Sequence, residues 1–380
     1  MIQIEVELVE HSPGAPWSGI GRYTRMLYRH FPSRVSARLT TQIDPPLARY
    51  SSFFHHLPVG VRRHRPGSIV HFMEDLGSSQ MLWRPVRPAI ATSHDLGMLV
   101  WPQEGTMHRP PDRIMWHLSY LGLKRMDAVI AVSEFSRRMV IKRLRIPPER
   151  VFAVQSGVDA SRFRPVPHAR AEIAARYGLR DSAEDKYLLY VGTEIPRKNL
   201  VTIFKAMARL PGNIRLLKVG DPGHWRFRAA TDRVLRELEL EDRVIFVDEV
   251  TEDELILLYN AADVYICSSF LEGFGLPVLE AMACGTPVVC SNASSLPEVA
   301  GEAAILVPPA DDRLFAEAIM SVLSNEGLSE QMKAKGLKRA GLFTWSRTAG
   351  GVVSVYEEVA RRRSTRHSDG RASGPRQETS

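Results

Sequence analysis

Cysteine is scarce in this chain, with only Cys267, Cys284 and Cys290 among 380 residues. An odd number of cysteines does not build a disulfide framework, and no histidine stands at a spacing that would complete a metal site. The chain also lacks an apolar run long enough to span a bilayer, and residues 1–7 alternate like a strand rather than like a signal peptide. These absences predict a metal-free protein of the reducing cytoplasm.

Positive and negative side chains are unevenly distributed along the chain, whose net charge is +7. Residues 1–170 carry 24 Lys and Arg against 13 Asp and Glu, whereas residues 171–360 carry 20 against 28. Residues 361–380 carry six against two. A basic first half favours an acidic acceptor or an anionic membrane surface as a partner. No nucleic-acid-binding motif accompanies it, so nucleic acid is not a predicted partner.

The length and the alternation of strands with helices predict an α/β protein of two Rossmann-like domains that face each other across a cleft. We expect the first domain in residues 1–168, the second in 169–344 and a final helix in 345–360. Residues 361–380 are polar and nearly free of apolar side chains, so they are predicted to be a disordered tail.

A glycine-rich turn between a strand and a helix organises the second domain. The apolar run 264–267 predicts a buried strand, Gly273 and Gly275 allow a tight turn, and Pro277 suits the start of a helix. The backbone N–H groups at such a helix start, near Leu276, favour a phosphate.

Two carboxylates flank this turn, Glu272 just before the glycines and Glu280 in the helix. Ionised carboxylates are strong acceptors for hydroxyl groups. A phosphate-binding turn between two hydroxyl acceptors indicates a nucleotide sugar. The alternative is a helix start with favourable acidic residues near it.

The first domain has a similar turn after its first strand, with Gly19 and Gly21 before a predicted helix. A dehydrogenase would carry a third glycine there, in the pattern Gly-x-Gly-x-x-Gly, but Thr24 stands at that position. The dehydrogenase reading is therefore disfavoured, and turn glycines with no ligand remain an alternative.

The segment from Glu272 to Glu280, with seven residues between them and the run Gly273-Phe274-Gly275-Leu276-Pro277 inside it, resembles the signature of retaining glycosyltransferases of family 4. This resemblance implies the GT-B fold, in which the last helix crosses back to the first domain. It implies that Glu280 holds the nucleotide ribose, that Glu272 contacts the transferred sugar, and that the turn residues bind the donor. A nucleotide sugar is a substrate, so no cofactor is expected.

Other segments extend the resemblance over nearly the whole chain before the tail. Gly19 and Gly21 match the glycine loop that closes over the donor. Arg197 and Lys198 match an Arg-Lys-Asn segment whose cations hold the donor diphosphate, and both residues are natural phosphate partners. His94 follows a predicted strand and matches a histidine beside the donor sugar.

The nucleobase contact is placed by the resemblance at the backbone near Val250. The family commonly has glycine directly after the preceding strand, where this chain has Asp248. The resemblance therefore leaves the identity of the base open.

The implied activity is sugar transfer with retention, with His94 and Glu272 as the catalytic residues that orient the sugar. The segments around His94 and residues 132–136 resemble mannosyltransferases of polysaccharide assembly, including lipopolysaccharide, so GDP-mannose is the expected donor. UDP- and ADP-sugars remain open. The expected acceptor is a glycan or a lipid-diphosphate-linked glycan.

The basic helix predicted in residues 135–146 and the three arginines at 361–363 have two readings, a solvated surface or a contact with the inner face of a membrane. Two functional alternatives also remain. One is a nucleotide-sugar epimerase of similar fold, which would turn over donor without an acceptor. The other is a non-catalytic member that only binds a membrane or a partner.

Overall fold

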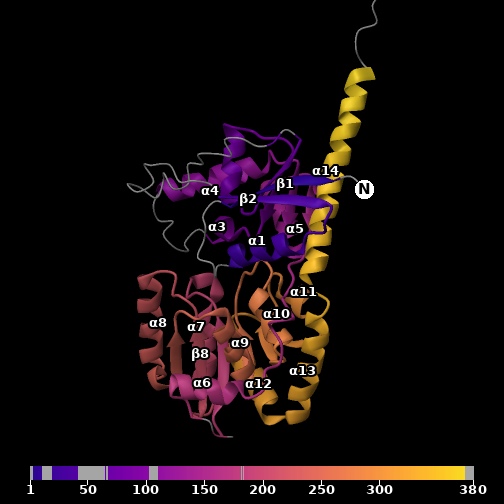
Figure 1. Cartoon of the computed structure of the whole chain (residues 1–380). Helices are drawn as coiled ribbons and strands as arrows, with labels where there is room; N and C mark the ends of the chain where they lie inside the picture. The colour runs from indigo at the N-terminus through magenta and orange to yellow at the C-terminus, as the bar shows by residue number, and fades with distance from the viewer. Residues whose placement is uncertain are drawn as a thin grey trace, which may run out of the picture.

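Two parallel β-sheets, one in each half of the chain, form the framework of the computed structural model (Figure 1). The structure describes residues 3–10, 19–41, 65, 67–101, 110–180, 182 and 184–372. The first sheet has the strand order β2-β1-β3-β4-β5-β6, and the second has the order β12-β11-β10-β7-β8-β9. All recorded pairings are parallel, which confirms the predicted pair of Rossmann-like domains.

The inner strands of the first domain are mostly buried, as expected for sheets covered by helices on both faces, whereas the edge strand of residues 35–41 is largely exposed. They are β1 (Ile4–Glu10), β2 (Val35–Thr41), β3 (Ile69–Phe72), β4 (Ala89–Ser93), β5 (Ala128–Ala131) and β6 (Val151–Ala153). The helical segments are α1 (Gly19–His30), η2 (Leu76–Leu82), α3 (Gly97–Val100), α4 (Pro110–Leu123), α5 (Glu134–Leu144) and η4 (Pro148–Arg150).

The second domain repeats this alternation. Its strands are β7 (Lys186–Val191), β8 (Ile214–Val219), β9 (Val244–Val247), β10 (Val264–Cys267), β11 (Val288–Ser291) and β12 (Ala304–Val307). Its helical segments are α6 (Ala169–Tyr177), η5 (Pro196–Lys198), α7 (Leu200–Ala208), α8 (Trp225–Glu237), η6 (Glu241–Arg243), α9 (Glu252–Ala261), α10 (Leu276–Ala283), α11 (Leu296–Ala300), α12 (Asp312–Ser324) and α13 (Glu326–Ala340).

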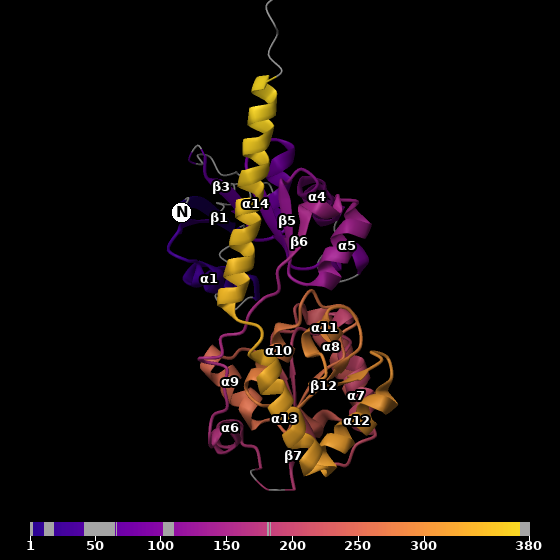
Figure 2. The same ribbon diagram turned by 90° about the vertical axis from the view of Figure 1, so that its right-hand side faces the viewer.

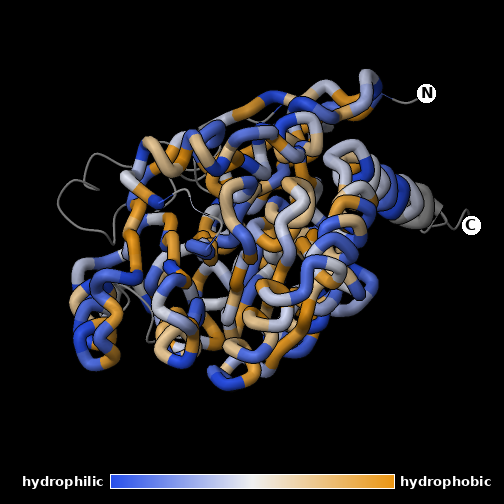
Figure 3. Tube along the Cα trace, turned by 90° about the horizontal axis from the view of Figure 1, so that it is seen from below, coloured by the Kyte–Doolittle hydropathy of each residue, from blue (hydrophilic) through white to orange (hydrophobic). Residues whose placement is uncertain are grey.

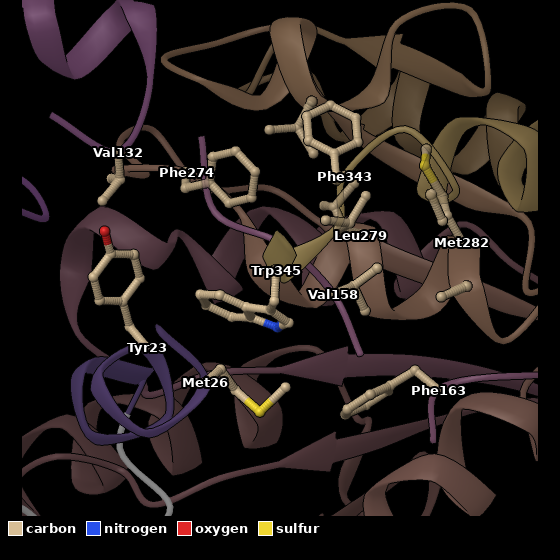
Figure 4. Close-up of a cluster of buried hydrophobic side chains, with 14 of the residues drawn as sticks. Tyr23, Met26, Val132, Val158, Phe163, Phe274, Leu279, Met282, Phe343 and Trp345 are labelled. Atoms are coloured by element: carbon tan, nitrogen blue, oxygen red, sulfur yellow. The ribbon is translucent and has the colours of Figure 1, made fainter. Parts of the chain in front are cut away.

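Hydrophobic segments run through the middle of the molecule, with hydrophilic segments around them (Figure 3). One apolar cluster belongs to the first domain, one to the second, and the largest joins the two. In that joint cluster, Phe274 of the second domain packs edge-to-face on Phe343, while Trp345 packs against Tyr23 of the first domain (Figure 4). No helix in the described part of the chain is long and apolar enough to cross a membrane.

The last helix, α14 (Trp345–Ala372), crosses from the second domain back along the first, as Figure 2 shows. The prediction of disorder from Arg361 is wrong for residues 361–372, because the helix continues through them. Arg362 pairs with Glu358 one turn earlier at 2.5 Å and donates to the Glu149 carbonyl at 2.9 Å. These contacts extend the helix beyond its apolar part. Residues 373–380 lie outside the described residues.

Gly273 is a point of close backbone approach between the domains. A Cβ atom there would lie 1.8 Å from the His94 carbonyl oxygen. The Gly273 carbonyl accepts hydrogen bonds from the hydroxyls of Ser133 and Ser136, at 2.6 and 2.9 Å. Ser133 also caps the N-terminus of α5, where its hydroxyl accepts the Ser136 backbone N–H. The turn and the first domain are therefore held in direct backbone contact.

Glu298 of the second domain extends this contact. The backbone N–H groups of Glu134 and Phe135, at the start of α5, donate to its carboxylate at 2.9 and 3.2 Å. A carboxylate at a helix N-terminus is favoured by the helix dipole. The domain interface thus has an apolar centre and a polar contact at α5.

His71 connects α14 to the first sheet. One ring nitrogen bonds the Tyr356 hydroxyl on α14 at 2.7 Å, and the other bonds the Thr92 hydroxyl on β4 at 2.8 Å. Burial is the main cause that lowers the pKa of His71 to about 3, from an ordinary value of 6.5. The ring is therefore neutral in the folded protein.

Replacing His71 should make stability less dependent on pH. As pH falls from about 6.5 towards 3, the unfolded chain binds a proton that folded His71 does not, so wild-type stability falls. One such proton corresponds to roughly 1.4 kcal/mol per pH unit. We expect urea unfolding to show that the free energy of unfolding falls less steeply between pH 7 and pH 4.5 in His71→Gln than in the wild type. Equal slopes in the two proteins would contradict this account of His71.

An alanine at position 273 should prevent the domains from closing. The added methyl group overlaps the His94 carbonyl. We therefore expect each domain of Gly273→Ala to be as stable to unfolding as in the wild type. We expect the radius of gyration of the variant in X-ray scattering to be larger. Gly350→Ala is the matched control, since its Cβ would meet no atom within 4 Å. Unchanged scattering in Gly273→Ala would show that the contact is not required.

Candidate functional site

The candidate site lies where the second sheet reverses its strand order, between β7 and β10. These two strands are neighbours and parallel, so the segments that follow them leave the same edge of the sheet. Ligands bind at such switch points in open α/β sheets. Lys198 follows β7, and Glu272 follows β10. The fold brings them together, with the Lys198 ammonium 2.7 and 2.9 Å from the two Glu272 carboxylate oxygens.

Glu272 is embedded in a polar setting although its side chain is only 12 % exposed. The Ser269 hydroxyl donates to its carboxylate at 2.6 Å, and its backbone N–H donates to the Ser294 hydroxyl at 3.0 Å. Burial alone would raise the pKa of Glu272, but the positive charges of Lys198 and Arg197 outweigh burial and hold the pKa below its usual value. The carboxylate is therefore ionised at neutral pH.

Arg197 reaches across the domain boundary. Its guanidinium lies 3.3 Å from the Asp95 carboxylate and donates to the Leu271 carbonyl at 3.2 Å. The Asp95 carboxylate also accepts a hydrogen bond from the Gly97 backbone N–H at 2.8 Å, just before α3. The contact between Asp95 and Arg197 was not predicted, because nothing in either local sequence indicates a partner in the other domain.

His94 lies directly after β4, as predicted, and beside the glycine turn. One ring nitrogen, Nε2, is 2.9 Å from the Met73 carbonyl oxygen, and the ring meets Tyr23 edge-on with centroids 5.0 Å apart. A carbonyl only accepts hydrogen bonds, so Nε2 carries the proton and Nδ1 is the acceptor. Burial is the main cause that lowers the pKa of His94, so the ring is neutral at pH 7.

The turn from Gly273 to Leu276 begins α10 as the sequence predicts. Gly275 is the N-cap with φ of 106°, a left-handed conformation that favours glycine, and Pro277 stands within the first two helical positions. The Phe274 side chain packs into the core between the domains, so only its backbone is available to a ligand.

Glu280 lies in α10 and is 3 % exposed. It accepts a hydrogen bond from the Tyr259 hydroxyl at 2.9 Å and forms an ion pair with Arg22 of the first domain. Arg22 also lies 3.3 Å from Glu252. Arg22 and Tyr259 are site residues that sequence reasoning missed. The only signal for Arg22 is its place directly after Gly21.

Gly19 and Gly21 belong to the first turn of α1 rather than to the loop that the sequence predicts. Residues 11–18 of that predicted loop lie outside the described residues. α1 faces the second domain (Figure 1), which is how Arg22 reaches Glu280.

Val250 follows β9 and precedes α9, at the same edge of the second sheet as Lys198. Nearby lies a charge cluster, buried at Glu194 and Lys218, that sequence reasoning missed. Glu194 binds Lys218 at 3.0 Å and Arg228 at 2.8 Å, and Arg228 also binds Asp248 at 2.7 Å. The acidic residue in place of the usual glycine is thus a partner of Arg228. A lysine inside the apolar strand β8 was the available signal.

Three sets of groups therefore meet at one edge of the second sheet. They are cations beside a helix N-terminus, two buried carboxylates with hydroxyl or cationic partners, and a neutral histidine from the first domain. This set can bind a diphosphate and accept hydrogen bonds from sugar hydroxyls. No group of three or more His, Cys, Asp or Glu side chains suited to a metal ion occurs among the residues that the structure describes.

Comparison with known proteins gives matches over both domains. The family model described as "Glycosyl transferases group 1" matches residues 175–339, and the model described as "Glycosyltransferase Family 4" matches residues 17–162. The O-antigen chain mannosyltransferase B of Escherichia coli is 32% identical over 279 residues, which are 71% of this chain and 70% of that protein. The serotype-specific mannosyltransferase WbdA of Escherichia coli is 28% identical over 77% of this chain, but the match spans only 36% of that longer protein.

Solved structures show the same architecture. Sucrose-phosphate synthase from Thermosynechococcus elongatus superposes with a TM-score of 0.76 at 25% identity and covers 95% of this chain and 100% of its own. Anabaena Alr3699/HepE, solved in complex with UDP-glucose, gives a TM-score of 0.72 at 17% identity, with 95% and 100% covered. WaaG, a glycosyltransferase involved in lipopolysaccharide biosynthesis, gives 0.65 at 16%, with 92% and 99% covered. The fold is therefore GT-B, and the chain belongs to the group 1, family 4 glycosyltransferases.

Proposed function

We propose that this glycosyltransferase moves mannose from GDP-mannose to a glycan acceptor, with retention at the anomeric carbon. The observation that carries the proposal is the Lys198–Glu272 pair at the switch point of the second sheet, next to the glycine turn that meets the backbone of His94. The choice of mannose rests on the names of two relatives, both mannosyltransferases.

The donor diphosphate would lie against Arg197, Lys198 and the start of α10. The two cations and the N–H groups of the helix stabilise negative charge, and that charge grows on the leaving diphosphate as the sugar bond breaks. An interaction that strengthens in the transition state accelerates the reaction. We therefore assign stabilisation of the leaving group to these protein groups and propose that no metal or cofactor takes part.

Glu272 and His94 would orient the sugar. When Lys198 binds phosphate, the ionised Glu272 carboxylate can accept hydrogen bonds from sugar hydroxyls in place of the ammonium. The unprotonated Nδ1 of His94 is a further acceptor. The acceptor hydroxyl would attack from the face that the diphosphate leaves and would pass its proton to the departing phosphate oxygen, which gives retention.

Glu280 would hold the ribose, as in the family. Its carboxylate now pairs with Arg22, so ribose hydroxyls would exchange with that guanidinium. The Tyr259 hydroxyl would keep the carboxylate in place during the exchange. Entry of the donor would then require α1 to move away from Glu280, which couples donor binding to movement of the first domain.

The acceptor would be a glycan of polysaccharide assembly, such as lipopolysaccharide O-antigen, carried on a lipid diphosphate. The relative that matches over 70% of its length is an O-antigen mannosyltransferase, and the basic first half suits an anionic carrier. Such an acceptor would bring the enzyme to the inner face of the membrane.

Neutralising either partner of the central pair should abolish transfer. We expect Glu272→Gln and Lys198→Met each to lower kcat by roughly 10²–10³-fold, the usual effect of removing one electrostatic contact to the transition state. The assay follows release of nucleoside diphosphate and formation of the glycoside from GDP-mannose, with and without a lipid-linked acceptor. Turnover of donor in the absence of acceptor would instead indicate an epimerase.

Glu330→Gln and Lys333→Met are matched controls, because these residues form an ion pair of the same length, 2.7 Å, on the exposed surface of α13. Circular dichroism checks that each variant is folded. Wild-type turnover in folded Glu272→Gln or Lys198→Met would refute the assignment.

A further inference from the structure

A second concave site lies in the first domain, at the end of the sheet opposite to the donor cleft. It is a cavity of about 580 Å³, within the size range of small-molecule sites. We call it the basic basin. Its wall is formed where β4, β5 and β6 begin, by the segment after α4 and by α14. Six of its lining side chains are cationic, namely Arg87, Lys124, Arg125, Arg150, Arg362 and Arg363, and one, Asp127, is acidic.

Backbone carbonyls hold several of these cations in place. Arg150 donates to the Lys124 carbonyl at 2.8 Å and also to that of Met126, and Arg125 donates to the Leu82 carbonyl at 3.0 Å. A carbonyl satisfies an N–H group but does not cancel the positive charge. Arg150 also covers the carbonyl groups beyond the end of α4, which would otherwise repel an anion.

Carboxylates neutralise only part of the basin. Arg87 pairs with Asp127 at 2.6 Å, and Arg362 pairs with Glu358 at 2.5 Å. Among the residues that the structure describes, no carboxylate lies within ion-pair distance of Lys124, Arg125 or Arg363. Lys124 and Arg125 come from the segment after α4 and Arg363 comes from α14, so these cations reach the concavity from two different parts of the fold.

The basin is separate from the donor site. It adjoins Asp127, which precedes β5, whereas Ser133, which contacts the glycine turn, follows the same strand. Strands rise about 3.3 Å per residue, so the length of β5 separates the two places. The basin takes no part in the proposed sugar transfer and stands whether or not that proposal is correct.

We propose that the basic basin binds a phosphate group. Arginine and lysine are the side chains that bind phosphate, through forked and point-charge contacts. The cavity is larger than one phosphate, so a phosphate with a head group attached fits it better. The molecule that carries this phosphate is best explained as an anionic phospholipid, because further exposed cations surround the basin. Arg361 lies beside it on α14, and Lys142 and Arg143 lie at the end of α5. A small phosphate ester is the other source of the same chemistry.

Protection of Lys124 from acetylation tests the proposal, because Lys124 is the one lysine of the basin. The rate of modification is read by mass spectrometry at constant ionic strength. One arm adds phosphatidylglycerol vesicles, with phosphatidylcholine vesicles as reference, and the other adds inorganic pyrophosphate. At ten times the dissociation constant we expect roughly tenfold slower modification of Lys124. The rate at Lys335, exposed on α13 of the second domain, should not change.

Two double variants distinguish the basin from general charge. Arg125→Ala/Arg363→Ala removes two basin cations and keeps Lys124 as the reporter, and Arg313→Ala/Lys338→Ala removes two exposed cations of the second domain. Loss of Lys124 protection in the basin variant but not in the control variant supports the proposal. Protection by phosphatidylglycerol vesicles would indicate a phospholipid, and protection by pyrophosphate would indicate a small phosphate ester. No protection of the wild type by either ligand, or equal loss in both variants, would overturn it. Loss of nucleoside-diphosphate binding in Lys198→Met, measured separately, reports on the donor site.

Discussion

The turn from Glu272 to Gly275 has to touch the backbone of the first domain, and the rest of the site depends on this contact. Gly273 has no room for a side chain, and its carbonyl oxygen receives two serine hydroxyls from α5. The contact places His94 beside the turn and brings Asp95 to Arg197. The candidate donor site is thus built from both domains through one close backbone approach.

Buried charges impose a second constraint, because an unpaired ion in a protein interior costs several kcal/mol. The site meets it by internal pairing. Lys198 holds Glu272, and Arg22 holds Glu280. A nucleotide sugar offers a substitute for each broken pair, with phosphate for the lysine and hydroxyl groups for the carboxylates. Binding then exchanges partners instead of creating new buried charge, which explains how a tightly packed site can still accept a ligand.

Much of the fold was predictable from local patterns. Apolar runs such as residues 264–267 predicted buried strands, although the largely exposed β2 was not predicted. The pattern of Gly275 followed by Pro277 predicted the start of α10, since positive φ and a missing N–H suit those two residues. Strand ends also placed Lys198 and Glu272 on one edge. The continuation of α14 past residue 360 was not predictable, because it rests partly on Arg362, which packs over Phe152 in the fold.

Contacts between distant residues set the limit of sequence reasoning. Arg22 and Glu280 are 258 positions apart, and neither local sequence indicates the other. The cluster around Glu194 likewise draws its members from three different strand ends and α8. The roles that the family assigns to Glu272 and Glu280 remain predictions, whereas their positions are structural facts.

The most direct test of the account is calorimetric titration of the wild type and of Lys198→Met with GDP, UDP, ADP and NAD. The account predicts that one nucleoside diphosphate, GDP if the donor is GDP-mannose, binds the wild type and binds Lys198→Met at least about tenfold more weakly, a difference of about 1.4 kcal/mol. Binding of NAD alone, or equal binding of the nucleotide by both proteins, would contradict a donor site at the Lys198–Glu272 pair.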